Sequence, residues 1–248
     1  MSPPDRIDPL TPGRFRLDGQ DVEFGPGESI LQAALRAGHV LPHLCWHPEL
    51  GAAGSCRVCS VLVNGRSGAA CTVPASAGLE VRSDTPELQQ QRQRLLQMLF
   101  VEGNHFCPAC EKSGDCRLQA SAYAAGMEGP HFEEFYLQRP VDASHPEVWL
   151  DLNRCILCGL CVRASEQLDH KSVFAIGGHG LAARLLVDSP DGRLAGSAIA
   201  AGDQALAVCP TGALLHKRVG FRTPIGRRRY DLEGLDGASP PQPPEATP

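Results

Sequence analysis

Alternating apolar and polar residues predict two short strands near the start of the chain. The segments 15–19 and 21–25 alternate with period two, and Asp18–Gly19 between them is typical of a tight turn. A helix is predicted to follow over 28–38, where Ser29–Gln32 has the spacing of a capping box and the last residue is a glycine that ends helices.

Further strand patterns complete a small mixed module. A β-rich run covers 58–63 and is closed by Asn64–Gly65, a strong hairpin signal. Strand-like pieces follow at 70–73 and 79–81. Two strands, a helix and then further strands is the order of a β-grasp domain, which we expect over 14–83.

The middle of the chain is predicted to be helical. One helix is expected to begin at Pro86, after an Asp84 or Thr85 cap, and its leucines recur at helical spacing. Glycine and proline then interrupt the pattern, and a second helix is expected over 117–125. We therefore expect a helical domain over 84–140.

The rest of the chain is predicted to form one further domain and two loose ends. The domain is expected over 141–215, which gives an α+β protein of three domains. Residues 1–13 hold four prolines and little periodicity, so they are read as a loose leader. The segment 216–248 begins with a basic run and continues, from residue 232, into a proline-rich tail that we expect to be disordered.

Composition and charge exclude several classes of protein. The 248 residues contain no apolar run approaching the roughly 20 that span a bilayer. The start of the chain lacks the charged flank and apolar stretch of a secretory signal. We therefore expect a cytoplasmic protein without a membrane span. The formal net charge of −5 disfavours nucleic acid as a partner.

Eleven cysteines, an odd number, are the most informative feature of the composition. All of them lie within 45–209, and ten fall in three groups. Because cytoplasmic thiols stay reduced, a disulfide framework is not expected. Grouped cysteines in such a protein indicate metal or redox chemistry.

The first set of cysteines has the ligand count of a 2Fe–2S cluster. It comprises Cys45, Cys56, Cys59 and Cys71. Its C-x2-C pair can converge on a small cluster from one loop, although the first gap is longer than in the plant-type C-x4-C-x2-C spacing. Two other interpretations are a zinc site and a Rieske centre, for which Cys45-Trp46-His47 offers half of the pattern. The 2Fe–2S interpretation is favoured.

The second set has one thiolate too few for a 4Fe–4S cluster. Cys107, Cys110 and Cys116 supply three ligands. His105 stands two residues before the first of them and is predicted to be the fourth ligand, since imidazole is a competent iron ligand. His131 is the alternative. A neutral imidazole removes one negative charge from the site, which raises its reduction potential.

The third set is typical of a bacterial ferredoxin. Cys155, Cys158 and Cys161 form the C-x2-C-x2-C run. Ser165 stands where that motif has a further cysteine for a second cluster, so no second cluster is expected there. Cys209, which precedes a proline, is predicted to complete a 4Fe–4S site. A zinc site is the competing interpretation.

No motif for binding a hydride donor or an organic substrate is found. The sequence lacks a G-x-G-x-x-G after a strand, a phosphate loop and a nucleophile elbow. We therefore expect no NAD or FMN on this chain, no catalytic residues, and a role as an electron relay. The run 216–230 has six Lys or Arg residues and no acid, which predicts a docking strip for an acidic partner, with a solvated tail as the alternative.

The motifs around these sets resemble a known family. EGNHFCPACEKSGDCRLQA, RCILCGLC, CPTGALLHKRVG and PIGRRRY closely resemble the small iron–sulfur diaphorase (HoxU, or gamma) subunit of cytosolic NAD-reducing NiFe hydrogenases. The resemblance runs over 15–230. The N-terminal part of the large iron–sulfur subunit of respiratory complex I is similar more distantly, with a histidine farther from its first cysteine. The N-terminus of molybdenum-containing formate dehydrogenases is similar as well.

The resemblance implies an electron-transfer subunit of a hydrogen:NAD+ oxidoreductase, with one 2Fe–2S and two 4Fe–4S clusters. Its partners would be an FMN- and NAD-binding diaphorase subunit and the small and large NiFe hydrogenase subunits. Electrons from hydrogen would enter near the one-histidine cluster, cross the ferredoxin-like cluster and leave by the 2Fe–2S centre. The alternatives are a subunit of another NAD-linked complex, such as a split formate dehydrogenase or a complex I-like enzyme, and a non-enzymatic redox sensor or zinc-binding adaptor.

Overall fold

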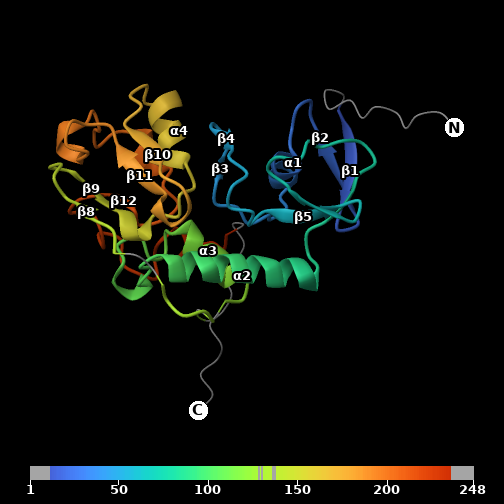
Figure 1. The fold of residues 1–248 in the computed structure, drawn as a ribbon. Helices are drawn as coiled ribbons and strands as arrows, with labels where there is room; N and C mark the ends of the chain where they lie inside the picture. Colours follow the sequence, from blue (N-terminus) through green and yellow to red (C-terminus); the bar gives the residue numbers. More distant parts are fainter. Residues whose placement is uncertain (1–11, 128, 130, 136–137, 236–248) are drawn as a thin grey trace, which may run out of the picture. The chain divides into compact units, whose positions relative to one another are not determined.

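Two compact units make up the chain, one over Met1–Arg94 and the other over Leu95–Pro248. The computed structural model describes residues 12–127, 129, 131–135 and 138–235 (Figure 1). Most of the expected leader and most of the expected tail therefore lie outside the described residues. The expected boundaries of three domains stay predictions.

The first unit is built on a five-stranded mixed sheet with the order β2-β1-β7-β5-β6. Its strands are β1 (Gly13–Leu17), β2 (Gln20–Phe24), β5 (Ser60–Val63), β6 (Arg66–Ala69) and β7 (Glu80–Arg82). Strand β1 is antiparallel to β2 and parallel to β7, whereas β5 is antiparallel to both β6 and β7. Helix α1 (Ile30–Arg36) contributes four buried apolar side chains to the core beneath this sheet. A two-stranded ribbon, β3 (Trp46–His47) with β4 (Gly51–Ala52), carries the loop before the first C-x2-C pair.

Short-range sequence signals are confirmed in this unit. Ser29 and Gln32 form the capping box of α1. Asn64–Gly65 turns the chain between β5 and β6, and both residues have positive φ angles.

The strand expected over 70–73 is wrong. Strand β6 ends at Ala69, whose carbonyl accepts hydrogen bonds from the amides of Thr72 and Val73. The chain therefore turns at this point and carries Cys71 inward, where it is buried.

Helix α2 (Pro86–Glu102) begins as the sequence predicts, and Thr85 is its cap. The Thr85 hydroxyl accepts a hydrogen bond from the Leu88 amide at 3.3 Å. Further along the helix, Arg92 is buried although it is charged. Its guanidinium donates to three backbone carbonyls in the first unit, those of Val58 (3.3 Å), Ser60 (2.9 Å) and Ser83 (2.7 Å). These contacts hold the first-unit part of the helix against the start of β5.

The second unit combines short helices with two small sheets. Its helices beyond α2 are α3 (Arg117–Ala124), α4 (Leu160–Gln167), α5 (Gln204–Ala207) and α6 (Arg229–Leu232). Its strands are β8 (Val141–Asp142), β9 (Val148–Asp151), β10 (Phe174–Gly177), β11 (Arg184–Val187) and β12 (Leu214–His216). The first sheet has the order β12-β9-β8, and β10 with β11 forms a separate hairpin. Helix α3 matches the expected helix to within one residue.

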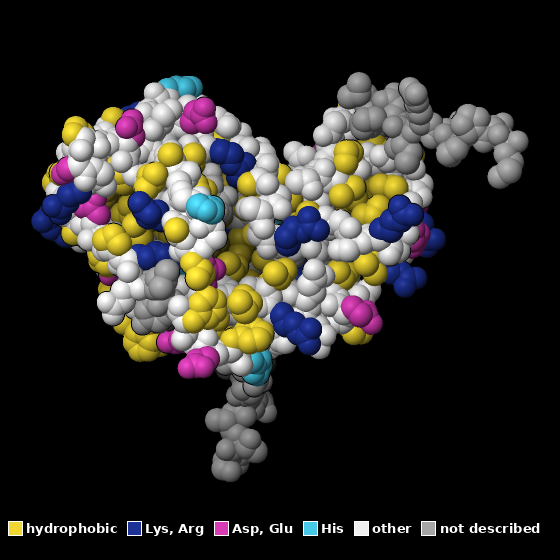
Figure 2. Space-filling model, in the orientation of Figure 1, with side chains coloured by type: hydrophobic (Ala, Val, Ile, Leu, Met, Phe, Trp, Pro, Cys, Tyr) yellow, Lys and Arg dark blue, Asp and Glu magenta, His cyan; other side chains and the backbone are white. Residues whose placement is uncertain are grey.

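Charged side chains of both signs lie on the face of the molecule drawn in Figure 2. Lys and Arg side chains are interspersed there with acidic and apolar ones. Among the helices that the structure describes, none has the length and apolar character needed to cross a bilayer.

Candidate metal-cluster sites

The four thiols of the first set lie together in the first unit. Cys45 directly precedes β3, the C-x2-C pair lies in the loop before β5, and Cys71 lies in the turn after β6. The Cys45 thiol has side-chain hydrogen bonds with Cys56 and Cys71, and Cys59 has one with Cys71. The Cys45 sulfur also accepts from the Cys56 amide at 3.5 Å. All four predicted ligands are therefore in one cluster of sulfur atoms.

The pKa values of these four thiols indicate that the set binds a positively charged group. Hydrogen bonds from Cys56 and Cys71 hold the pKa of the Cys45 thiol well below its ordinary value. The reciprocal contacts, together with burial, raise the pKa of Cys56 and of Cys71. A contact from Cys71 lowers the pKa of Cys59 to about 7. Four thiolates this close repel one another, so all four ionise together only around positive charge, which the irons of a cluster supply.

The loop that carries this set is tight. Gly54 has φ of +69°, and a Cβ there would lie 2.9 Å from the Cγ2 atom of Thr72. The neighbouring His47, half of a Rieske pattern, accepts a hydrogen bond at Nδ1 from the Glu49 amide at 3.3 Å. This nitrogen is thus engaged in the local turn.

The second set lines a small cavity in the second unit. Its walls include His105, Cys107, Cys110 and Cys116, the four predicted ligands. His105 follows the end of α2, and its ring lies 5.4 Å from the Phe100 ring, centroid to centroid. The alternative ligand His131 is exposed and does not line this cavity. Cys116 is the residue that precedes α3.

Electrostatics keep this imidazole available as a ligand. Burial, with the positive charge of Arg154 as a second cause, lowers the pKa of His105 to about 4. The ring is therefore neutral at pH 7 and has a free lone pair for a metal. Burial raises the pKa of Cys116 to about 12, which opposes a free thiolate there and favours one bound to metal.

The third set lines another small cavity of the same unit. All four predicted ligands, Cys155, Cys158, Cys161 and Cys209, contribute to its otherwise largely apolar wall. Left-handed backbone at Leu157 and Gly159 (φ 53° and 71°) folds the C-x2-C-x2-C loop tightly before α4. Burial raises the pKa of Cys155 to about 11 and that of Cys161 well above its usual range.

Ser165, which stands in place of a further cysteine, has a structural role. It is buried on α4, and its hydroxyl accepts a hydrogen bond from the Val173 amide at 2.8 Å. Within the described parts of the chain, no three His, Cys, Asp or Glu side chains are grouped around a position for a single metal ion.

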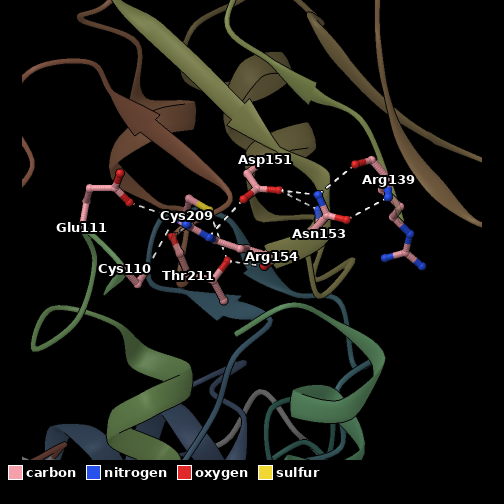
Figure 3. A network of polar contacts seen from close by, with 8 residues as sticks. All are labelled: Cys110, Glu111, Arg139, Asp151, Asn153, Arg154, Cys209 and Thr211. Atoms are coloured by element: carbon pink, nitrogen blue, oxygen red, sulfur yellow. Dashed lines mark hydrogen bonds and ion pairs between the residues drawn. The ribbon is translucent and has the colours of Figure 1, made fainter. Parts of the chain in front are cut away.

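One short segment, 209–213, adjoins both cavities of the second unit. Pro210 lines the third-set cavity, and its carbonyl accepts from the Cys116 thiol at 3.5 Å. Thr211 donates from its hydroxyl to the Arg154 carbonyl at 2.9 Å (Figure 3). Gly212 lines the second-set cavity. The two candidate 4Fe–4S sites are therefore neighbours with a shared wall.

Replacing Gly212 with alanine is expected to damage the second set. A Cβ at this position would lie 2.8 Å from the Cys110 sulfur, so the thiol must move or the loop must open. We expect a loss of up to about four irons per chain, the content of one 4Fe–4S cluster. Iron analysis checks this, with Gly202→Ala as the control, because a Cβ at Gly202 meets nothing within 4 Å. Equal iron content in both variants would contradict the prediction.

Two basic residues of the run 216–230 bind backbone carbonyls elsewhere in the second unit, which the sequence did not reveal. Arg228 is buried and donates from Nη1 to the carbonyls of Glu111 (2.8 Å) and Ser113 (2.5 Å), inside the second cysteine set. Lys217 donates to two carbonyls near β8. The other four basic side chains are exposed, and these are Arg218, Arg222, Arg227 and Arg229. The docking strip can therefore consist of those four at most.

Replacing Arg228 with glutamine is expected to loosen the second set. The substitution removes charge-assisted bonds to three carbonyls, those of Glu111, Ser113 and Thr223, and should lower the free energy of unfolding by about 2 kcal/mol. Thermal unfolding followed by the loss of visible cluster absorption measures the effect. Arg227→Gln, at the exposed neighbouring position, should leave the unfolding temperature unchanged. An equal effect of both variants would contradict the stabilising role of Arg228.

Three family models match consecutive parts of the chain. A 2Fe–2S iron–sulfur cluster binding domain matches residues 11–86. The NADH-ubiquinone oxidoreductase-G iron–sulfur binding region matches 92–131, and a 4Fe–4S single cluster domain matches 148–215. The three cysteine sets fall one in each. The α+β fold with a 2Fe–2S domain and 4Fe–4S binding regions is thereby confirmed.

Whole-chain relatives decide the family. The gamma subunit of the NAD-reducing hydrogenase HoxS of Cupriavidus necator is 39% identical over 224 residues, which cover 90% of this chain and 94% of the relative. The chain belongs to this family of hydrogenase gamma subunits. A chain in the crystal structure of an NAD+-reducing NiFe-hydrogenase in the H2-reduced state is 56% identical, with a TM-score of 0.88, over 92% of this chain and 97% of that one.

A more distant relative is much longer than this chain, which matches only part of it. The subunit designated G in the NADH-quinone oxidoreductase of Rickettsia prowazekii is 29% identical over 222 residues, which are 88% of this chain but 31% of the relative. The resemblance to NAD-reducing hydrogenase subunits, and the distant one to complex I, are both confirmed.

Proposed function

We propose that this chain is the iron–sulfur relay of the diaphorase module of an NAD-reducing NiFe hydrogenase. It would pass electrons between the hydrogenase module and the FMN- and NAD-binding subunit, for the reversible reaction of H2 and NAD+ to NADH and a proton. The observation that carries the proposal is the pair of neighbouring four-residue donor sets joined by 209–213, in a chain similar over nearly its whole length to a hydrogenase gamma subunit.

We propose one 2Fe–2S and two 4Fe–4S clusters, held by twelve ligands in three sets of four. The ligands are Cys45, Cys56, Cys59 and Cys71; His105, Cys107, Cys110 and Cys116; and Cys155, Cys158, Cys161 and Cys209. Buried and half-buried thiols and a neutral imidazole suit iron, and with eleven cysteines and one histidine as ligands every thiol of the chain is used. When bound, the clusters supply one-electron carriers.

The chain's own residues enclose these carriers and set the path between them. Apolar side chains and the Cys209–Pro210 turn keep water from the third set, while Phe100 and Gly212 close the second. We propose entry of electrons at the His105 set, transfer across the shared wall to the Cys155 set, and exit by the Cys45 set. The cytoplasmic location also stays a prediction.

Purification of the tagged chain with its partners, without oxygen, tests this function. We expect a flavin-containing NAD-binding subunit and the small and large NiFe subunits to copurify, and the complex to reduce NAD+ with hydrogen. The chain alone should not do so. Copurification with a molybdenum formate dehydrogenase or a quinone oxidoreductase instead, or hydrogen-dependent activity of the chain alone, would contradict the proposal.

A further inference from the structure

Arg154 is a charged side chain that contacts one predicted ligand of the second set. Its Nη1 donates to the Cys110 sulfur at 3.6 Å and to a Glu111 carboxylate oxygen at 2.9 Å. Its Nε lies 3.1 Å from a carboxylate oxygen of Asp151 (Figure 3). The side chain is only 17% exposed, and its guanidinium lies 5.4 Å from the centre of the Trp149 ring.

The backbone holds this guanidinium in a defined place. Arg154 directly precedes Cys155, and its carbonyl accepts from the Thr211 hydroxyl at 2.9 Å. Asp151 is buried and accepts from both the amide and the side chain of Asn153, at 3.0 and 2.8 Å. The charge is thus fixed beside the Cys110 sulfur by contacts on both sides.

A cation beside a ligand sulfur favours the reduced form of a cluster. One-electron reduction adds one negative charge to the cluster and its thiolates, and a hydrogen bond from a cation stabilises that charge. Hydrogen bonds to the sulfurs and local charge are among the factors that set cluster potentials. Glu111 and Asp151 carry opposite charge, so they hold the guanidinium but weaken its field at the sulfur.

We propose that Arg154 tunes the second set, raising its reduction potential through the Cys110 sulfur. Arg154 is a positioning residue that binds no iron itself. The inference rests on the proposed ligands of that set. Glu111 acts in the opposite direction, as a carboxylate that draws part of the guanidinium charge away from the sulfur.

Redox titration of the full chain, reconstituted with iron and sulfide and followed by EPR, tests this role. Dithionite supplies the electron that each cluster takes up. In Arg154→Met the second-set cluster should be about tenfold harder to reduce, which is about 59 mV for one electron. Glu111→Gln should shift the same cluster in the opposite direction, and Arg154→Lys should lie between the wild type and the methionine variant. Arg94→Met, an exposed arginine of the first unit, is the matched control.

Opposite shifts separate an electrostatic role from a structural one. A loosened site would shift in the same direction in both variants, so shifts of one sign, or no shift in Arg154→Met with its signal intact, would overturn the proposal. If Arg154→Met does not hold its cluster, Glu111→Gln and Arg154→Lys decide by the same criterion. Absence of a cluster from the second set is distinguishable, because the unsubstituted chain would then lack a second four-iron signal, and the fourth ligand is tested separately by the His105→Ala variant.

Discussion

Replacing His105 with alanine is expected to lower the iron content from about ten to about six per chain, by the loss of one 4Fe–4S cluster. The second set has only three cysteines, and His105 is the residue that completes its cavity with a neutral ring. EPR of the reduced full chain should lose one 4Fe–4S signal and keep the 2Fe–2S signal. His105→Cys, which restores a fourth donor, should recover the iron.

His131→Ala is the matched control for this substitution, since that histidine is exposed and away from the cavity. It should leave iron content and every EPR signal unchanged. Loss of a 4Fe–4S signal in His131→Ala, or an intact set of signals in His105→Ala, would reject His105 as the fourth ligand.

Replacing Arg92 with alanine is expected to destabilise the first unit by about 3 kcal/mol. The substitution leaves three backbone carbonyls without their charged donor, and two of them, on the buried residues Val58 and Ser60, flank the predicted ligand Cys59. The 2Fe–2S absorption should therefore be lost at a lower urea concentration than in the wild type, while the 4Fe–4S signals of the second unit respond less.

Arg94→Ala provides the comparison on the same helix, because Arg94 is exposed. It should change the free energy of unfolding by no more than about 0.5 kcal/mol. Equal midpoints for the two variants would show that the carbonyl contacts of Arg92 do not support the first set.

Sequence signals with a local physical cause predicted the elements of the fold well. The capping box at Ser29 and the hairpin turn at Asn64–Gly65 are short-range features, and the structure contains both. The strand expected over 70–73 failed because the chain turns directly after Ala69, whose carbonyl accepts hydrogen bonds from the amides of Thr72 and Val73. Local pattern does not distinguish the end of a strand from the turn that follows it.

Parts of the candidate sites that depend on distant contacts were not predictable. Arg92, Arg154 and Arg228 read as surface residues, because long charged side chains are seldom buried. Their partners are backbone carbonyls, carboxylates and a sulfur that the fold brings together from up to 117 positions away. Gly212 reads as a turn glycine, and its closeness to the Cys110 sulfur follows only from the meeting of two cysteine sets.

The candidate ligand sets could be predicted from the sequence because cluster chemistry demands a fixed number of donors at short spacing. The structure brings each predicted set together, by thiol contacts in the first and by a common cavity in the second and third. Spacing along the sequence did not show that the second and third sets lie next to each other, because this depends on the segment 209–213.

The central claim is that this chain holds three clusters in series, and a count of its metals tests it most directly. Iron, acid-labile sulfide and zinc should be measured on the anaerobically purified full chain, together with low-temperature EPR. We predict about ten irons and about ten sulfides per chain, from clusters of two, four and four irons, with negligible zinc and one 2Fe–2S and two 4Fe–4S signals. Stoichiometric zinc, or an iron content far below ten in protein whose cysteines are all reduced, would contradict the account.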